Sequence, residues 1–215
     1  MEGNHLEFIA PGDIEDRSME IIQSEMGPHS FTREQLPIVK RCIHTSADFD
    51  YVKNLAFTPG AVAAGIAAIR QGCTIVTDTQ MARAGINKRV LAKFGGEAVC
   101  FMSDADVAQE AKARGVTRAV VSMERAAKLP GTVILAVGNA PTALARACEL
   151  ASERAFAPAL IVGVPVGFVN VVESKNILER TPGEHIVARG RKGGSNIAAT
   201  ICNAMLYMAS NNERE

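Results

Sequence analysis

Apolar residues near the start of the chain recur at the three- and four-residue spacing of an amphipathic helix. This pattern runs over residues 14–26, and Gly27-Pro28 stops it. Thr32-Arg33-Glu34-Gln35 has the form of a capping box, and the apolar face that follows it reaches His44. The chain is therefore predicted to begin with a pair of helices, the second of which ends near His44.

After Thr58 the pattern changes to short apolar runs that alternate with helical periodicity. Thr58-Pro59 is typical of a helix start, and this helix is predicted to reach about Arg70, before Gly72. The apolar runs have the length of buried strands and span residues 73–77, 98–101, 132–137, 159–164 and 186–188. Helical patterns lie between and after them, over residues 104–114, 117–128, 141–154, 170–179 and 196–208.

Strands that alternate with helices in this way are typical of a parallel sheet with crossover helices. The predicted fold is therefore α/β: an open, doubly wound, mainly parallel sheet with helices on both faces and an N-terminal helical pair. No linker, repeat or low-complexity tract divides the sequence, so residues 1–215 are predicted to form a single domain. The order of the strands does not follow from the sequence.

The composition agrees with a compact fold and narrows the range of partners. Hydrophobic residues make up 47% of the 215 residues and charged residues 21%, as in ordinary globular proteins. Lysine plus arginine and aspartate plus glutamate each total 23, so no overall field attracts the protein to nucleic acid or an anionic membrane. Met1 to His5 do not begin a signal peptide, and no apolar run reaches the roughly 18 residues of a membrane helix. We expect a soluble, cytoplasmic protein.

The positions of cysteine and histidine argue against a metal site. The five cysteines are widely spaced and lack a C-x-x-C pair, so we expect most of them to be small buried side chains in a reducing cytosol. The histidines have no paired spacing with one another or with carboxylates; they are His5, His29, His44 and His185. The sequence therefore predicts neither a metal nor another cofactor.

Binding chemistry in an open α/β sheet is expected at the carboxyl ends of the strands. Four turns marked by glycine or proline follow predicted strands, over residues 78–86, 138–144, 163–168 and 190–196. We expect them to gather on one edge of the sheet. Each also has an ordinary structural explanation, because glycine and proline cap helices and shape the connections between strands and helices.

Two of these turns carry candidate donors to an anion. Gly138-Asn139-Ala140-Pro141 is typical of an Asn-capped helix start, and it also leaves amide donors that face a bound anion. Gly190-Arg191-Lys192-Gly193-Gly194-Ser195 places two cations beside glycines, so side-chain and backbone donors reach carboxylates or phosphates. This segment lacks the order of a Walker loop, and no dinucleotide fingerprint or nucleophile elbow follows a strand.

Other polar residues are candidates for acid–base or ionic roles. His44 is a candidate proton donor or acceptor, because histidine is the side chain suited to acid–base chemistry at cellular pH, although a lone histidine beside apolar neighbours is often structural. Glu173-Ser174-Lys175 indicates either an ion pair or, more simply, a solvated helix face. Arg118 and Arg125 are spaced to point the same way, with surface solubility as the alternative.

Seven short segments along the chain form a combined pattern. They are the segment around Ser18, Ile43-His44-Thr45, Asp78-Thr79-Gln80-Met81, Gly138-Asn139-Ala140-Pro141-Thr142-Ala143-Leu144, Pro165-Val166-Gly167-Phe168-Val169, Glu173-Ser174-Lys175 and Gly190-Arg191-Lys192-Gly193-Gly194-Ser195. In this order they resemble the precorrin-8X methylmutases of corrin biosynthesis, also called cobalt-precorrin-8 methylmutases or precorrin isomerases. The resemblance extends from about Pro11 to Met208.

The resemblance implies an intramolecular methyl shift from C-11 to C-12 of a corrin precursor, giving cobyrinate or its metal-free counterpart hydrogenobyrinate. No methyl donor is consumed. The resemblance also implies that His44 donates or accepts the proton, that Ser18 contacts the tetrapyrrole and that Arg118 binds it. Members of this family form homodimers with the active site near the subunit interface.

Such a substrate carries several acetate and propionate groups around an apolar ring, which a neutral protein with local cations is able to bind. Arg118, Arg191 and Lys192 are predicted to bind these carboxylates, and Val166 and Phe168 to form apolar walls. The rest of the predicted substrate-binding set is polar: Ser18, Thr45, Gln80, Asn139 and Ser195.

Two other functions remain open at this point. The first is a corrinoid-binding or carrier protein that uses the same pocket without catalysis. The second, which does not depend on the resemblance, is an α/β enzyme that acts on a phosphate-bearing metabolite, although the missing phosphate-binding fingerprints disfavour it.

Overall fold

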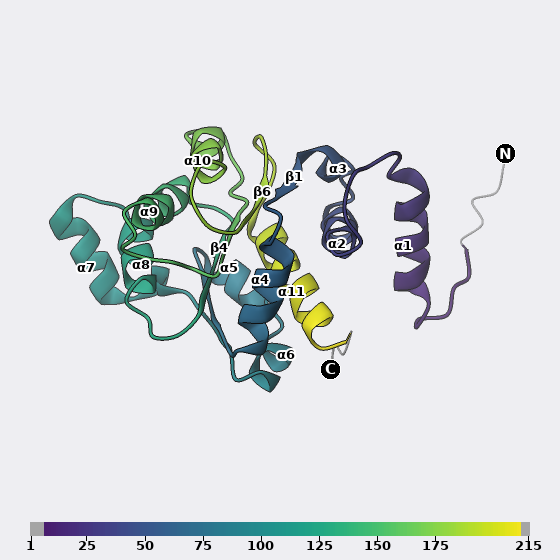
Figure 1. The fold of residues 1–215 in the computed structure, drawn as a ribbon, viewed down its shortest axis with the longest axis horizontal. Coiled ribbons are helices and arrows are strands. Elements are labelled where there is room, and N and C mark those ends of the chain that lie inside the picture. The colour runs from purple at the N-terminus through teal and green to yellow at the C-terminus, as the bar shows by residue number, and fades with distance from the viewer. Residues whose placement is uncertain (1–6, 212–215) are drawn as a thin grey trace.

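The computed structural model describes residues 7–211, and its centre is a six-stranded sheet with the strand order β1-β6-β5-β4-β2-β3 (Figure 1). The strands are β1 (Leu55–Phe57), β2 (Thr74–Thr77), β3 (Glu97–Val99), β4 (Val133–Val137), β5 (Leu160–Gly163) and β6 (His185–Ala188). All neighbouring pairs are parallel except β1 and β6, which are antiparallel. The predicted α/β fold with a mainly parallel sheet is confirmed.

Helices occupy most of the remaining chain. They are α1 (Ile14–Glu25), α2 (Leu36–Ser46), α3 (Tyr51–Asn54), α4 (Ala61–Arg70), α5 (Gln80–Gly85), α6 (Lys88–Lys93), α7 (Ala105–Arg114), α8 (Arg118–Ala126), α9 (Pro141–Ser152), α10 (Val171–Leu178) and α11 (Ser195–Ala209), with a 3₁₀ turn at Phe101–Ser103. Within residues 7–211, no helix has the length and apolarity needed to cross a bilayer.

The side chains of the strands alternate between two apolar layers, as expected for a sheet covered on both faces. Ile75, Ile134 and Val162 belong to the cluster that includes α2, α4 and α11. Leu135 and Ile161, one position away on the same strands, belong to the cluster under α8 and α9. Figure 1 shows these two groups of helices on opposite sides of the sheet, with α1 beside α2 at one end of the molecule.

The strand order has a switch point between β2 and β4. The chain runs from β2 outward to β3, then returns to β4 on the other side of β2 and continues outward to β5 and β6. In doubly wound sheets ligands bind beside such a point, at the carboxyl ends of the strands. A ligand is therefore expected beside the turns that follow β2 and β4.

The predicted elements are found with a few corrections. The five predicted strands and the N-terminal helical pair are present, and α1 contacts α2. The strand expected over residues 98–101 ends at Val99, and Phe101 begins a 3₁₀ turn. The sequence did not predict β1, α3, α5 or α6, because three to six residues are too few to show a periodicity. A single domain over residues 1–215 stays a prediction, and Met1 to His5 lie outside the described residues.

Candidate active site

The capping box and the end of α2 fix the position of His44. Thr32 and Gln35 bond reciprocally, with the Thr32 amide donating to Gln35 Oε1 at 3.1 Å and the Gln35 amide to Thr32 Oγ1 at 3.2 Å. At the other end, Ala47 adopts a left-handed conformation with φ 54° and its amide donates to the Ile43 carbonyl. His44 therefore lies in the last turn of α2, as predicted.

The His44 side chain is exposed, whereas Cys42 and Ile43 beside it are buried. Within residues 7–211 no hydrogen bond or ion pair of the structure involves the imidazole. His44 is therefore not a structural histidine held in the core by hydrogen bonds. The ring is available to a ligand.

Thr45 connects this helix end to the start of α11. Its Oγ1 lies 3.0 Å from Thr200 Oγ1 on α11. Since α11 follows the turn after β6, this contact places the end of α2 beside the carboxyl edge of the sheet.

The four predicted turns meet at that edge. The Gly194 amide donates to the Val164 carbonyl at 2.9 Å, and the Gly167 amide to the Arg191 carbonyl at 3.1 Å, which joins the turns after β5 and β6. A Cβ atom on Gly138 would lie 2.7 Å from Ser195 Cα, so glycine is needed where the turn after β4 approaches the start of α11. The predicted gathering of the turns is confirmed.

Asp78 joins the remaining two turns across the switch point. Its side chain is buried, and Oδ1 accepts the Gly138 amide at 2.8 Å while Oδ2 accepts the amides of Asn139 at 2.8 Å and Ala140 at 2.6 Å. Burial raises the pKa of Asp78, and the three amide donors oppose this effect. The amides of the 138–141 turn, predicted to face a bound anion, are thus occupied by Asp78.

Two residues of the predicted substrate-binding set, Ser195 and Gln80, form hydrogen bonds between segments at the same edge. Ser195 Oγ lies 2.7 Å from Oγ1 of Thr79, whose hydroxyl also accepts the Ala82 amide and caps α5. Gln80 donates through Nε2 to the Cys100 carbonyl at 3.3 Å and to Ser103 Oγ at 3.2 Å. These contacts bring the segments after β2, β3 and β6 together.

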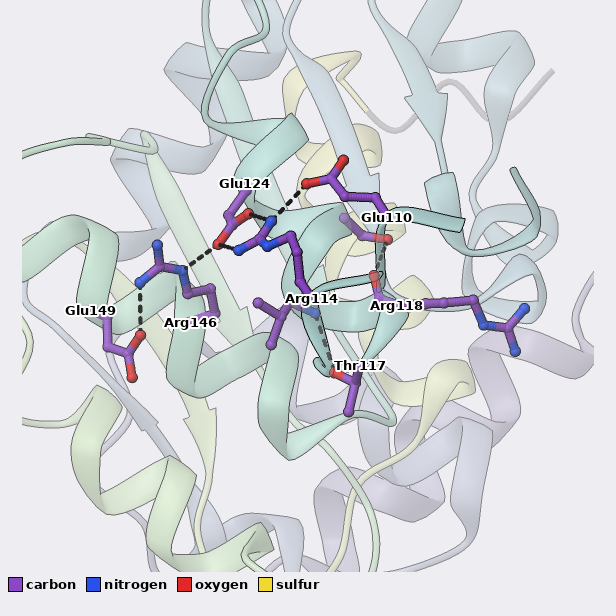
Figure 2. Close-up of polar contacts among 9 residues, drawn as sticks. Glu110, Arg114, Thr117, Arg118, Glu124, Arg146 and Glu149 are labelled. Carbon is purple, nitrogen blue, oxygen red and sulfur yellow. Dashed lines mark hydrogen bonds and ion pairs between the residues drawn. The ribbon is translucent and has the colours of Figure 1, made fainter. Parts of the chain in front are cut away.

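Arg118 opens α8 at the same edge, and its Nη1 donates to the Met102 carbonyl at 3.1 Å. Figure 2 shows its guanidinium pointing away from the ion-pair network in which Arg114 bonds Glu110 and Glu124, and Glu124 bonds Arg146. Arg125, the other cation of α8, pairs with Asp106 at 2.7 Å, and a shared direction of Arg118 and Arg125 stays a prediction. Arg118 is therefore the cation of α8 that is available to an anionic ligand.

The turns after β5 and β6 combine a cation with exposed apolar side chains. The Arg191 guanidinium lies 5.3 Å from the centroid of the Phe168 ring, within the range of a cation–π contact. Phe168 is 80% exposed and Val166 47% exposed. Large apolar side chains exposed beside a cation form the kind of surface that binds an apolar ring with acidic substituents.

The two lysines of this region have different environments. Lys192 Nζ lies 2.6 Å from Asp48 Oδ2 and 2.6 Å from Asp50 Oδ2, and hydrogen bonds to these carboxylates raise the pKa of Lys192. Lys175 is buried and donates to the carbonyls of Gly190 at 2.7 Å and Lys192 at 2.8 Å. The expectation of a solvated face over residues 173–175 is wrong for Lys175, because its ammonium turns inward to the carbonyls of the glycine-rich turn.

Burial lowers the pKa of Lys175 from 10.5 to about 8. The unfolded chain therefore binds more protons than the folded chain between these values, and the contribution of Lys175 to the free energy of unfolding rises with pH there. Wild type should gain on the order of 1–2 kcal/mol relative to Lys175→Met between pH 8 and 9.5. Urea unfolding of both proteins at each pH measures this. The two proteins are compared because buried cysteines such as Cys42, whose pKa is raised, lower the free energy of unfolding as pH rises and do so equally in both. A constant difference would contradict the assignment.

Ser18 is not joined to this edge by any contact among the described residues. It lies half-buried on α1, and its hydroxyl donates to the Ile14 carbonyl one turn earlier at 2.8 Å. Its predicted contact with substrate stays a prediction. Within residues 7–211, no group of three or more His, Cys, Asp or Glu side chains is arranged to hold a metal ion.

Comparison with known proteins shows the family to which the chain is related. The model of the family described as precorrin-8X methylmutase matches residues 13–208. The chain belongs to this family. Its cobalt-precorrin-8 methylmutase relative from Priestia megaterium is 46% identical over 94% of this chain and 89% of the relative, and the one from Leptospira interrogans is 43% identical over 92% and 94%. A crystal structure of precorrin-8x methyl mutase from Thermus thermophilus matches with a TM-score of 0.84 and 39% identity, over 93% of this chain and 98% of that chain.

Membership of this family makes the protein an isomerase of cobalamin biosynthesis, a methylmutase that moves a methyl group within one molecule. It decides against the enzyme acting on a phosphate-bearing metabolite. The sequence missed the buried roles of Asp78 and Lys175 and the pairing of Asp48 and Asp50 with Lys192. A carboxylate directly after a buried strand and facing an amide-rich turn was the signal that could have revealed Asp78.

Proposed function

We propose that the protein moves the methyl group at C-11 of precorrin-8 to C-12, forming cobyrinate or hydrogenobyrinate, with His44 as the proton donor. The observation that carries this proposal is the exposed imidazole of His44 at the end of α2, beside the carboxyl edge where the four turns meet. A titratable group next to a ligand-binding edge is the arrangement that acid catalysis needs.

The chemistry requires little more than a proton and a fixed geometry. Protonation of a ring nitrogen or an adjoining position draws electron density from the conjugated system and makes the carbon that receives the methyl group more electrophilic. The methyl carbon leaves C-11 with its bonding electron pair and forms a bond to C-12, so no external methyl donor enters. The conjugated double bonds shift to include C-11, and the proton returns from the ring to His44, so substrate and product are isomers. General acid catalysis contributes about a hundredfold to ten-thousandfold to such a rate. Holding the flexible macrocycle in a reactive shape contributes further.

Substrate binding is assigned to side chains that the edge leaves available. Arg118 and Arg191 bind peripheral carboxylates, and Phe168 with Val166 contacts the apolar ring. Asn139 has an exposed side chain, and only its backbone amide donates to Asp78. Thr45, Gln80 and Ser195 offer polar groups from positions already fixed by hydrogen bonds to the protein. Ser18 is assigned a substrate contact on the family resemblance alone.

The substrate is proposed to contain cobalt. Cobalt-precorrin-8 methylmutases from several organisms are 34–46% identical to this chain, and the one from Salmonella typhimurium is 46% identical over 79% of it. The precorrin-8X methylmutases from Pseudomonas aeruginosa and Sinorhizobium are 36% and 33% identical. Cobalt is here part of the substrate.

We further propose that the protein works in the cytoplasm as a homodimer with the active site near the interface. Ile14 and Ile21 on α1, 53% and 38% exposed, offer apolar contacts for a second subunit.

A corrinoid carrier would use the same edge without catalysis, so colour in the bound state does not separate it from an enzyme. Catalytic turnover does. Incubation of limiting protein with a large excess of cobalt-precorrin-8 is expected to convert many equivalents of substrate per subunit, followed through the absorption change of the chromophore. An absorption change that stops at one equivalent per subunit would favour the carrier.

A further inference from the structure

Lys192 connects the glycine-rich turn to the segment that directly follows His44. Its Nζ lies 2.6 Å from Asp48 Oδ2 and from Asp50 Oδ2. The backbone of this segment is fixed to the helix end and to the Asp48 carboxylate, because the Asp48 amide donates to Ser46 Oγ at 3.2 Å and the Asp50 amide to Asp48 Oδ1 at 2.9 Å. Ser46 Oγ in turn donates to the Cys42 carbonyl at 2.7 Å, so this turn is continuous with the last turn of α2.

The turn that carries Lys192 is itself fixed from the protein interior. Buried Lys175 donates to the carbonyls of Gly190 and Lys192, and the Gly194 amide donates to Val164. Ser195 contacts Thr79. Lys192 therefore extends from a turn that is fixed by hydrogen bonds to the end of the helix that carries His44.

The surroundings of the Lys192 ammonium do not suit a substrate carboxylate. Two aspartates already surround one ammonium, so the cluster has a net charge of −1, and an incoming carboxylate would be repelled by the same oxygens that attract Lys192. Arg191, by contrast, lies over a phenylalanine ring and leaves its donors available. The neighbouring cations of this turn therefore differ in function.

We propose that Lys192 is a positioning residue: through Asp48 and Asp50 it holds the end of α2, and His44 with it, against the turn that carries Arg191 and Ser195. This inference rests on the proposed function of His44 and replaces the carboxylate-binding role predicted for Lys192 from the sequence. Exposed ion pairs contribute little to folding stability, so their loss leaves a folded protein. Their loss is instead expected to shift His44 relative to the substrate, and a displacement of about 1 Å lowers a catalytic rate by up to a hundredfold.

The test compares Lys192→Met, the double variant Asp48→Asn/Asp50→Asn and the combined triple variant in steady-state kinetics. We expect the first two to lower kcat by a similar factor of about ten, with KM changed less than twofold, and the triple variant to be no worse than either. Lys192→Arg should recover most of the rate, because arginine is able to pair with the same carboxylates. Arg189→Met is the matched control, since it breaks an exposed ion pair with Glu179 just before this turn and is expected to keep the wild-type kcat.

A substrate-binding role would give a different pattern. In that case Lys192→Met raises KM, while removal of the two aspartate charges leaves KM unchanged or lowers it, and this result overturns the proposal. Unchanged kinetics in all variants overturn it as well. Absence of turnover in wild type would instead contradict the proposed function. Hydrogen exchange then still tests the link, because faster exchange of amides 44–50 in both Lys192→Met and Asp48→Asn/Asp50→Asn is expected from the contact alone, and unchanged exchange rejects it.

Discussion

Substitution of His44 by alanine is expected to lower kcat of the methyl shift by about a hundredfold to ten-thousandfold, with KM changed little. The expected loss lies in kcat because the proton is needed as the methyl group migrates, whereas binding depends on Arg118, Arg191 and the apolar surface. Since the imidazole is exposed and has no bond to the described protein residues, its removal leaves the fold intact. Single-turnover absorption with saturating enzyme separates this step from product release.

His29→Ala is the matched control for this prediction. The His29 ring packs near Phe31, with 5.7 Å between the ring centroids, on the connection between α1 and α2. It lies outside the proposed site, so the variant should keep kcat. A folded His44→Ala protein that binds substrate and turns it over at the wild-type rate would contradict acid–base catalysis by His44.

Asp78→Asn is expected to lower the free energy of unfolding by about 3 kcal/mol, with a fall in melting temperature of about 6–12 °C. The carboxylate accepts three amide protons, from Gly138 on one oxygen and from Asn139 and Ala140 on the other. A carboxamide has one oxygen, so in either orientation its own NH₂ group faces an amide donor that has lost its acceptor. Although burial disfavours the charge of Asp78, this mismatch outweighs the relief of removing it.

Asp16→Asn provides the comparison for Asp78→Asn, because Asp16 is exposed on the first turn of α1. We expect a change of less than about 0.5 kcal/mol there. Thermal unfolding of the three proteins under identical conditions measures both effects. Equal stability of Asp78→Asn and wild type would show that Asp78 does not hold the switch point together.

The position of His44 followed from local signals in the sequence. The capping box at Thr32 and Gln35 and the apolar spacing of α2 both act within a few residues, so the end of the helix could be predicted without knowledge of the fold. The meeting of the four turns was predictable for a related reason, since the carboxyl ends of parallel strands lie on one edge whatever the strand order.

Contacts between distant parts of the chain could not be predicted in this way. Asp78 reaches amides 60 to 62 residues away, and Lys192 reaches Asp50 across 142 residues. Lys175 was expected at the surface because lysine is seldom buried, yet two carbonyls 15 and 17 residues later satisfy its ammonium. Strand β1 has only three residues and pairs antiparallel with β6, so neither its length nor its direction fits the alternating pattern.

The most direct test of the proposed reaction follows the methyl group itself. Cobalt-precorrin-8 labelled with ¹³C in the methyl group at C-11 is incubated with a small fraction of an equivalent of wild-type protein, and the product is examined by ¹³C NMR. We expect the label to appear quantitatively at C-12, without any added methyl donor and over many turnovers. Label that stays at C-11, or that moves in only one equivalent per subunit, would contradict an intramolecular methyl shift catalysed by this protein.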